Sequence, residues 1–210
     1  MNSIVDHKHK ANHTCNMQSI KDNTEGSLTE EQKQIIVGCL LGDGAMRIKT
    51  NALLEINHSV KQKVLVDWIY THLHEFVGTA PKQRKGNGGR IAYRFTTRSL
   101  PVFTDFYKQF FFKKKKLIPT NLILSPLTLA VWFMDDGNKS RSSVYLNTQQ
   151  FSLEEQKLLR AKLYEQWQIE TTLNKDKHYF RIRIKTSSVN KFIGLIKPYL
   201  LQEFYYKLPL

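Results

Sequence analysis

The sequence contains little cysteine and no long apolar run. Cys15 and Cys39 are the only cysteines among 210 residues. One lies in a polar segment and the other in an apolar one, so we expect no disulfide framework and a reducing compartment. No apolar run reaches the roughly 18 residues of a membrane-spanning helix. The first residues also lack the apolar core of a secretion signal.

Acidic residues are scarce relative to basic ones. The chain has 18 Asp and Glu against 32 Lys and Arg, which gives a formal net charge of +14. Residues 1–27 contribute none of this excess, because three lysines there balance three acids. A hydrophobic content of 41% permits a buried core. The folded part is therefore basic, which favours a nucleic-acid partner over a soluble protein without a specific ligand.

Residues 1–27 are polar, and we expect them to form a flexible tail. His7, His9, His13 and Cys15 are possible zinc ligands, but their spacing matches no standard zinc finger. The sequence therefore predicts a solvated tail rather than a zinc site.

The rest of the chain is internally repeated. Three features occur twice in the same order: residues 94–99 and 183–188, residues 116–119 and 207–209, and an apolar run that ends in Asp-Gly at Asp43 and at Asp136. The two members of each pair are separated by about 90 residues. Two copies of such a module are too few for a solenoid. We therefore expect two related modules, residues 28–121 and 122–210, with pseudo-twofold symmetry.

The hydrophobic patterns predict the same elements in both modules. In the first, we expect a helix from about residue 29 to 43, strands at 47–49 and 53–57, a helix at 60–76, strands at 79–84 and 90–96, and a helix at 100–112. In the second, we expect a helix at 127–136, strands at 139–141 and 144–147, a helix at 152–167, strands at 171–175 and 179–185, and a helix at 189–200. The predicted fold class is α+β, with two αββαββα modules and antiparallel sheets.

Basic residues share one face of the predicted strands. Arg181, Arg183 and Lys185 alternate with Ile182 and Ile184, so one face is cationic and the other apolar. The same two-residue or four-residue step separates the remaining basic pairs: Arg47 and Lys49, Lys82 and Arg84, Arg90 and Arg94, Lys139 and Arg141. A charged face can be merely solvated, but the recurrence of one sign on five strands favours contacts with phosphates and bases.

Asp43 and Asp136 end the two repeated helices. A carboxylate at a helix C-terminus is unfavourable unless a cation is present, so both aspartates are candidate metal ligands. If the helices pack side by side, these carboxylates and the adjacent carbonyls of Gly42 and Asp135 give oxygen ligands suited to Mg²⁺. Gly38 and Gly42 would allow close packing. Taken alone, Asp-Gly is also a common hairpin turn, and helix glycines can serve packing only.

Residues 36–44 and 129–137 resemble the two nine-residue motifs of single-chain LAGLIDADG homing endonucleases. The resemblance covers about residues 30–209 and implies a saddle formed by the two sheets. It further implies that Asp43 and Asp136 are catalytic, metal-binding aspartates. By the same resemblance, Lys116 and Lys207 are catalytic basic residues near the scissile phosphates.

The resemblance implies a monomeric, Mg²⁺-dependent enzyme that cuts both strands of a double-stranded DNA site of about 20 base pairs. We expect 3′ overhangs, mobility of a host intron and about two or three bound metal ions, with Mn²⁺ supporting cleavage and Ca²⁺ supporting binding only. The expected compartment is a mitochondrion or chloroplast, with the bacterial cytoplasm as the alternative.

The sequence departs from the family pattern in two places. Glu55 stands where the family often has Gln, and Tyr145 stands at the matching place of the second module. The second motif has Val131 and Asp135 where the first has Gly38 and Gly42. We therefore expect an asymmetric helix interface and unequal cleavage of the two DNA strands. An RNA maturase that assists splicing of its own intron and an inactive DNA-binding regulator remain alternatives.

Overall fold

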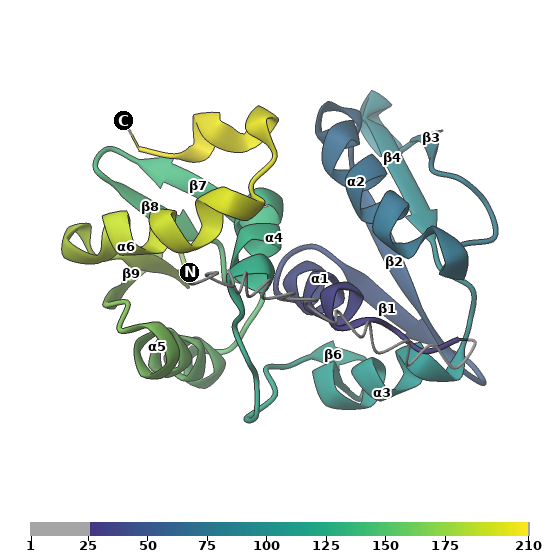
Figure 1. Cartoon of the computed structure of the whole chain (residues 1–210), viewed down its shortest axis with the longest axis horizontal. Coiled ribbons are helices and arrows are strands. Elements are labelled where there is room, and N and C mark those ends of the chain that lie inside the picture. The colour runs from purple at the N-terminus through teal and green to yellow at the C-terminus, as the bar shows by residue number, and fades with distance from the viewer. Residues whose placement is uncertain (1–25, 210) are drawn as a thin grey trace, which may run out of the picture.

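The computed structural model describes residues 26–209, which form two modules side by side (Figure 1). Almost all of the tail expected over residues 1–27, including its histidines and Cys15, lies outside the described residues. Between residues 26 and 209, no helix combines the length and apolar character needed to cross a membrane.

Both modules have the predicted order αββαββα. The first contains α1 Glu30–Leu41, β1 Ala45–Ile48, β2 Ala52–Ser59, α2 Lys63–Leu73, β3 Lys82–Lys85, β4 Ile91–Thr96 and α3 Pro101–Phe110. The second contains α4 Pro126–Asp136, β7 Gly137–Ser140, β8 Ser143–Leu146, α5 Leu153–Trp167, β9 Thr171–Asp176, β10 Tyr179–Ile184 and α6 Thr186–Ile196. Each module has one antiparallel four-stranded sheet, in the order β1-β2-β4-β3 or β7-β8-β10-β9. The predicted α+β fold is confirmed.

Local capping fixes where the two central helices begin. Thr29 and Gln32 form a reciprocal capping box at the start of α1. Ser125 accepts a hydrogen bond from the backbone of Thr128 at the start of α4, and Pro126 takes the first helical position. Helix α1 ends at Leu41, so the predicted end at Asp43 is wrong. The backbone N–H of Asp43 bonds to the Asp135 carboxylate instead of continuing the helix.

Helices α1 and α4 pack against each other at the centre of the molecule (Figure 1). A Cβ atom on Gly38 would lie 2.6 Å from Cβ of Val131, and one on Gly42 would lie 2.2 Å from Oδ2 of Asp135. These glycines therefore permit the close approach that the sequence predicts, and the facing residues make the interface asymmetric.

A short hairpin follows α3 and was not predicted. Helix α3 ends at Phe110, and the next residues form β5 Phe111–Phe112 and β6 Lys115–Lys116. Lys113 and Lys114 between them have positive φ angles of 49° and 67°, as a two-residue hairpin turn requires. The predicted helix end at residue 112 is therefore wrong. The turn reverses the chain and brings Lys116 back to the end of α1.

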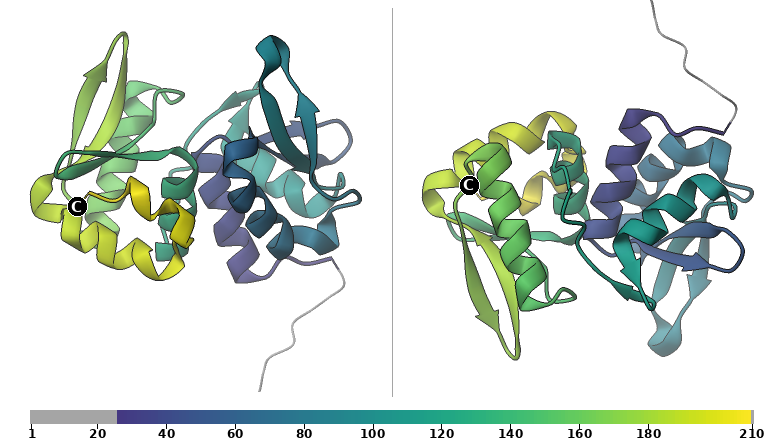
Figure 2. Two further views of the ribbon diagram at one scale, coloured as in Figure 1. Left: turned by 90° about the horizontal axis from the view of Figure 1, so that it is seen from above. Right: turned by 90° about the horizontal axis from the view of Figure 1, so that it is seen from below.

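Each sheet has one core face and one outer face. In β2, the side chains of Leu54, Ile56 and His58 are buried, whereas Glu55 and Asn57 point to the other side. Figure 2 shows that the β3–β4 and β9–β10 hairpins project from the same side of the molecule, with the paired helices between them. The outer faces of the two sheets therefore flank the junction of α1 and α4.

Candidate functional site

Asp43 and Asp136 share one hollow at the ends of α1 and α4. Asp43 is exposed and Asp136 is half-buried. Together with Asn147, Gln149 and Gln150 they line a hollow of about 360 Å³. The two aspartates predicted from the repeat are therefore brought together from positions 93 apart in the sequence (43 to 136).

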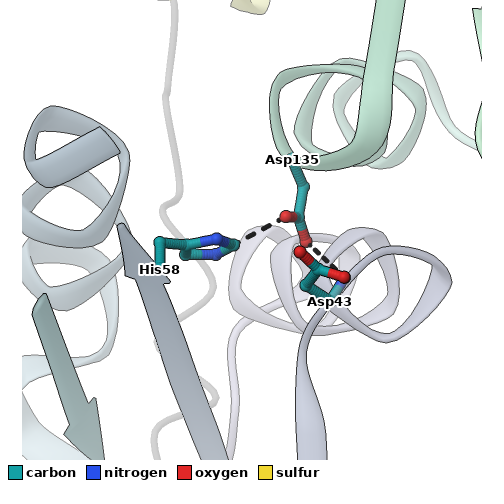
Figure 3. Close-up of side chains that lie close together, drawn as sticks. All are labelled: Asp43, His58 and Asp135. Carbon is teal, nitrogen blue, oxygen red and sulfur yellow. Dashed lines mark hydrogen bonds and ion pairs between the residues drawn. The ribbon is translucent and has the colours of Figure 1, made fainter. Parts of the chain in front are cut away.

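Asp135 links the two modules beneath this hollow. Its carboxylate is buried, and Oδ2 accepts a hydrogen bond of 2.8 Å from the backbone N–H of Asp43. The other oxygen, Oδ1, has no hydrogen-bond partner among the described residues. Nε2 of His58 lies 3.5 Å from Oδ1 (Figure 3). Asp135 was predicted as a metal residue, and here its side chain as well as its carbonyl lies at the centre.

Lys116 and Lys207 occupy equivalent places at the two helix ends. Lys116 Nζ donates to the carbonyl oxygens of Gly42, at 2.8 Å, and Gly44, at 2.7 Å. Lys207 Nζ donates to the carbonyl oxygen of Met134 at 2.6 Å. Both ammonium groups offset the negative end of a helix dipole. Burial lowers the pKa of Lys116 to about 8 and also lowers the pKa of Lys207.

The carbonyl of Gly42, predicted as a metal ligand, already accepts two hydrogen bonds. One comes from Lys116 and the other, of 2.9 Å, from Nε2 of Gln150 in the second module. A carbonyl oxygen has two lone pairs, so one of these donors must move before Gly42 can ligate an ion. The side-chain carboxylates are the accessible oxygen ligands.

The electrostatics of the hollow suit a cation. Burial, reinforced by the charge of Asp43, raises the pKa of Asp135 and of Asp136 to about 7 in each case. Carboxylates that are crowded and partly dehydrated in this way are stabilised by a bound divalent ion. The oxygen-rich lining of the hollow, with the carboxylates of Asp43 and Asp136, fits the expected Mg²⁺.

Glu55 and Tyr145 occupy matching positions in the two sheets. Glu55 pairs across the sheet with Ala45, and Tyr145 pairs with Asn138. Ala45 and Asn138 each lie two residues after an aspartate that lines the hollow. Glu55 forms ion pairs with Arg47, at 2.9 Å, and Arg94, at 3.5 Å.

Tyr145 instead lies beneath the guanidinium of Arg181, whose Cζ is 4.0 Å from the ring centroid. The modules thus present different chemistry beside the hollow.

Strand pairing places six of the predicted basic residues on the outer faces. Arg94 pairs with Asn57 and Lys82, and Arg183 pairs with Tyr145. Residues that pair directly across a sheet share a face, so both arginines lie on the outer face. The six are Arg47, Lys82, Arg84, Arg94, Arg181 and Arg183. Lys49, Arg90 and Arg141 lie just outside the strands, and Arg141 has a φ of 49° in the β7–β8 turn.

Two predicted members of the basic face are misplaced. Lys139 pairs with Val144, so its side chain lies on the core side of edge strand β7. The phase of β7 is set by the pairing of Asn138 with Tyr145, which the sequence pattern did not reveal. Lys185 follows β10, forms a 3.1 Å ion pair with Glu170 and lies beside α5. Helix α5 covers the core side of the sheet, so Lys185 also leaves the outer face.

Sequence reasoning missed four residues at the centre. His58 occupies a core position in the alternating pattern of β2, where a polar residue is a detectable anomaly. Asn147, Gln149 and Gln150 follow β8 and line the hollow. A hydrogen bond from Asn147 opposes the rise in the pKa of Asp136. No spacing signal in the sequence identifies these three.

The two αββαββα modules pack their first helices together, and Asp43 and Asp136 lie at one end of this helix pair, between two basic sheet faces. This arrangement defines a two-module nucleic-acid-binding fold with a candidate metal site at its centre. Residues 33–192 match the sequence profile of the LAGLIDADG DNA endonuclease family. The chain belongs to this family.

Individual relatives include both endonucleases and a maturase. The chain is 29% identical over 208 residues to the cytochrome b mRNA maturase bI2 of Debaryomyces hansenii, covering 92% of this chain and 79% of that protein. It is 29% identical over 197 residues to the probable intron-encoded endonuclease 1 of Wickerhamomyces canadensis, covering 87% and 85%. The solved structure of the homing endonuclease I-WcaI bound to its DNA recognition sequence is similar, with a TM-score of 0.80, 26% identity and 88% of each chain covered.

Proposed function

We propose that the chain is a site-specific homing endonuclease that hydrolyses both strands of a double-stranded DNA target of about 20 base pairs. The observation that carries this proposal is the pair Asp43 and Asp136 in one hollow, flanked by two basic sheet faces. The I-WcaI structure, with its bound recognition sequence, supports the same role for this fold.

The outer faces are the proposed DNA surface. Arginines and lysines there would contact phosphates and release counterions, and some would read base edges. Cleavage at the junction of the two modules would take place across the minor groove and leave 3′ overhangs. The guanidinium of Arg181 lies over the ring of Tyr145, and this contact would restrict its orientation toward the DNA.

Asp43 and Asp136 would hold Mg²⁺ beside the two scissile phosphates, about two or three ions in all. When bound, the metal would supply charge that stabilises the pentacoordinate phosphorus and lowers the pKa of water. Lys116 and Lys207 would keep the helix ends in place and add positive charge near the phosphates. We expect Mn²⁺ to support cleavage and Ca²⁺ to support binding without cleavage.

We further propose that the protein promotes mobility of a host intron in a mitochondrion or chloroplast. An intron-encoded endonuclease among the relatives supports an intron origin. A monomer is sufficient, because the two modules already bring both aspartates into one hollow.

RNA maturation is a second candidate function, because one relative is a cytochrome b mRNA maturase. A maturase would use the fold and the basic faces but would not require both aspartates. Cleavage of a plasmid that carries the intronless insertion site separates the two functions, and it also separates both from an inactive DNA-binding regulator.

The test compares Asp43→Asn and Asp136→Asn with the wild type and with Asp105→Asn, a control at an exposed position on α3. We expect each of the first two changes to abolish double-strand cleavage in Mg²⁺ while binding in Ca²⁺ persists, because the metal-bridging charge is lost and the basic faces remain. The control should cut normally. A double-strand cutter from either variant would contradict the proposal, as would a wild type that assists splicing but never cuts the plasmid.

A further inference from the structure

Three potential ligand groups meet on the first-module side of the hollow. One ligand atom each from Asp43, His58 and Asp135 lies within 4.8 Å of the others. His58 extends from β2, Asp43 follows α1, and Asp135 lies in the last turn of α4 (Figure 3). Asp43 is exposed and the other two are buried, so the cluster is open to solvent on the Asp43 side.

The buried members do not satisfy each other. The distance from His58 Nε2 to Asp135 Oδ1 is 3.5 Å, longer than the roughly 2.7–3.2 Å of a good N–H···O hydrogen bond. Oδ1 of Asp135 has no hydrogen-bond partner among the described residues. A buried carboxylate oxygen without a hydrogen-bond donor can ligate a cation.

We propose that Asp43, His58 and Asp135 bind one divalent transition-metal ion of the zinc and cobalt type, at a position separate from the Mg²⁺ held between Asp43 and Asp136. Mg²⁺ prefers oxygen ligands, whereas an imidazole nitrogen with carboxylate oxygens suits Zn²⁺ and Co²⁺. Tetrahedral bonds of about 2.0–2.1 Å place ligand atoms about 3.4 Å apart. The 3.5 Å between His58 and Asp135 already fits this geometry.

The proposed site is restricted to the first module. Counting from the matching pair Glu55 and Tyr145, the residue equivalent to His58 is Thr148. The Thr148 hydroxyl is buried and bonded to Gln156, at 3.0 Å, and to the backbone N–H of Ile182, at 3.2 Å. A satisfied hydroxyl offers no vacant ligand, and the equivalent of Asp135 is Gly42. Within residues 26–209, the proposed transition-metal site therefore occurs once, in the first module.

The experiment titrates the metal-free full-length chain with Zn²⁺ by calorimetry and with Co²⁺ by visible absorption, in excess Mg²⁺. It compares the wild type with His58→Gln and with His178→Gln, a control in the exposed β9–β10 turn. The tail histidines and Cys15 are present in all three proteins, so any metal bound there cancels. We expect the wild type and the control to bind one more Zn²⁺ than His58→Gln and to show a Co²⁺ spectrum that this variant lacks.

Loss of His58 should weaken this one site by more than the roughly 10- to 100-fold that removal of an outer hydrogen-bond partner costs. Equal Zn²⁺ stoichiometry and affinity in the wild type and His58→Gln would overturn the proposal. If His58→Gln does not fold, crystals of the wild type soaked in Zn²⁺ decide the question, since an anomalous peak is expected between His58 and Asp135, and its absence refutes the site. These readouts require no DNA cleavage, so failure here is distinct from failure of the proposed endonuclease function.

Discussion

Replacement of Gly38 by Ala tests the closest contact between the two modules. The new Cβ would lie 2.6 Å from Cβ and 2.8 Å from Cγ1 of Val131, and 2.9 Å from the carbonyl oxygen of Thr128. Carbon atoms pack best at about 3.5–4.0 Å, so α1 and α4 must separate by about 1 Å. Overpacking of this kind costs about 1–3 kcal/mol. The rigid neighbours favour the upper end of that range.

A helical Ala gains about 1 kcal/mol over Gly, so we expect Gly38→Ala to lower the free energy of unfolding by about 2 kcal/mol net. Gly194→Ala is the matched control, because Gly194 lies in helix α6 and a Cβ there meets nothing within 4 Å. The control should gain up to about 1 kcal/mol. Urea unfolding followed by circular dichroism measures both changes.

A double-mutant cycle with Val131→Gly isolates the contact. Val131→Gly is destabilising alone, but it removes the opposing Cβ, so it should cost less in the Gly38→Ala background, with a coupling of about 1 kcal/mol or more. The Thr128 carbonyl still limits full recovery. If Gly38→Ala is as stable as Gly194→Ala, or if the coupling is zero, the helices do not approach as described.

Three further outcomes follow. Arg183→Ala should weaken specific DNA binding by roughly tenfold or more with little change in thermal stability, whereas Ile182→Ala should cost about 2–5 kcal/mol of folding stability; the opposite pattern would mean that the strand faces are exchanged. In metal-free protein the raised pKa of Asp136, about 7, gives stability that is complete below its unfolded pKa and is lost as pH rises through 7. Denaturation from pH 5 to 8 should therefore show a steeper loss for the wild type than for Asp136→Asn, and equal slopes would exclude this titration. Light scattering at micromolar concentration should give a monomer, and an obligate dimer would contradict the self-contained two-module site.

The fold was predictable because its signals are local and repeated. Alternation of Arg181 and Arg183 with Ile182 and Ile184 fixes the two faces of β10 without knowledge of any other strand. The same holds for the helices, whose apolar positions recur at helical spacing. Because the chain is duplicated, the order of elements predicted for one module could be compared with the order predicted for the other.

Most of the failures depend on contacts with residues far along the chain. Helix α1 stops before Asp43 because Asp135, far along the chain, takes its backbone N–H. The phase of Lys139 depends on how β7 pairs with β8. The run from Phe111 to Lys116 has no period that distinguishes a hairpin from a helix. The proposed role of His58 depends on its proximity to Asp135, which the sequence pattern does not reveal.

The unequal residues across the helix pair also restrict how the modules can be combined. Two copies of the second module would place Val131 against Val131, and the two side chains would clash because neither faces a glycine such as Gly38. Two copies of the first would face Gly42 with Gly42 and lose the carboxylate that ties Asp43 across the axis. If the two modules were made as separate chains, we would therefore expect them to form a heterodimer in preference to either homodimer. The covalent link joins two surfaces that already recognise each other as unlike partners.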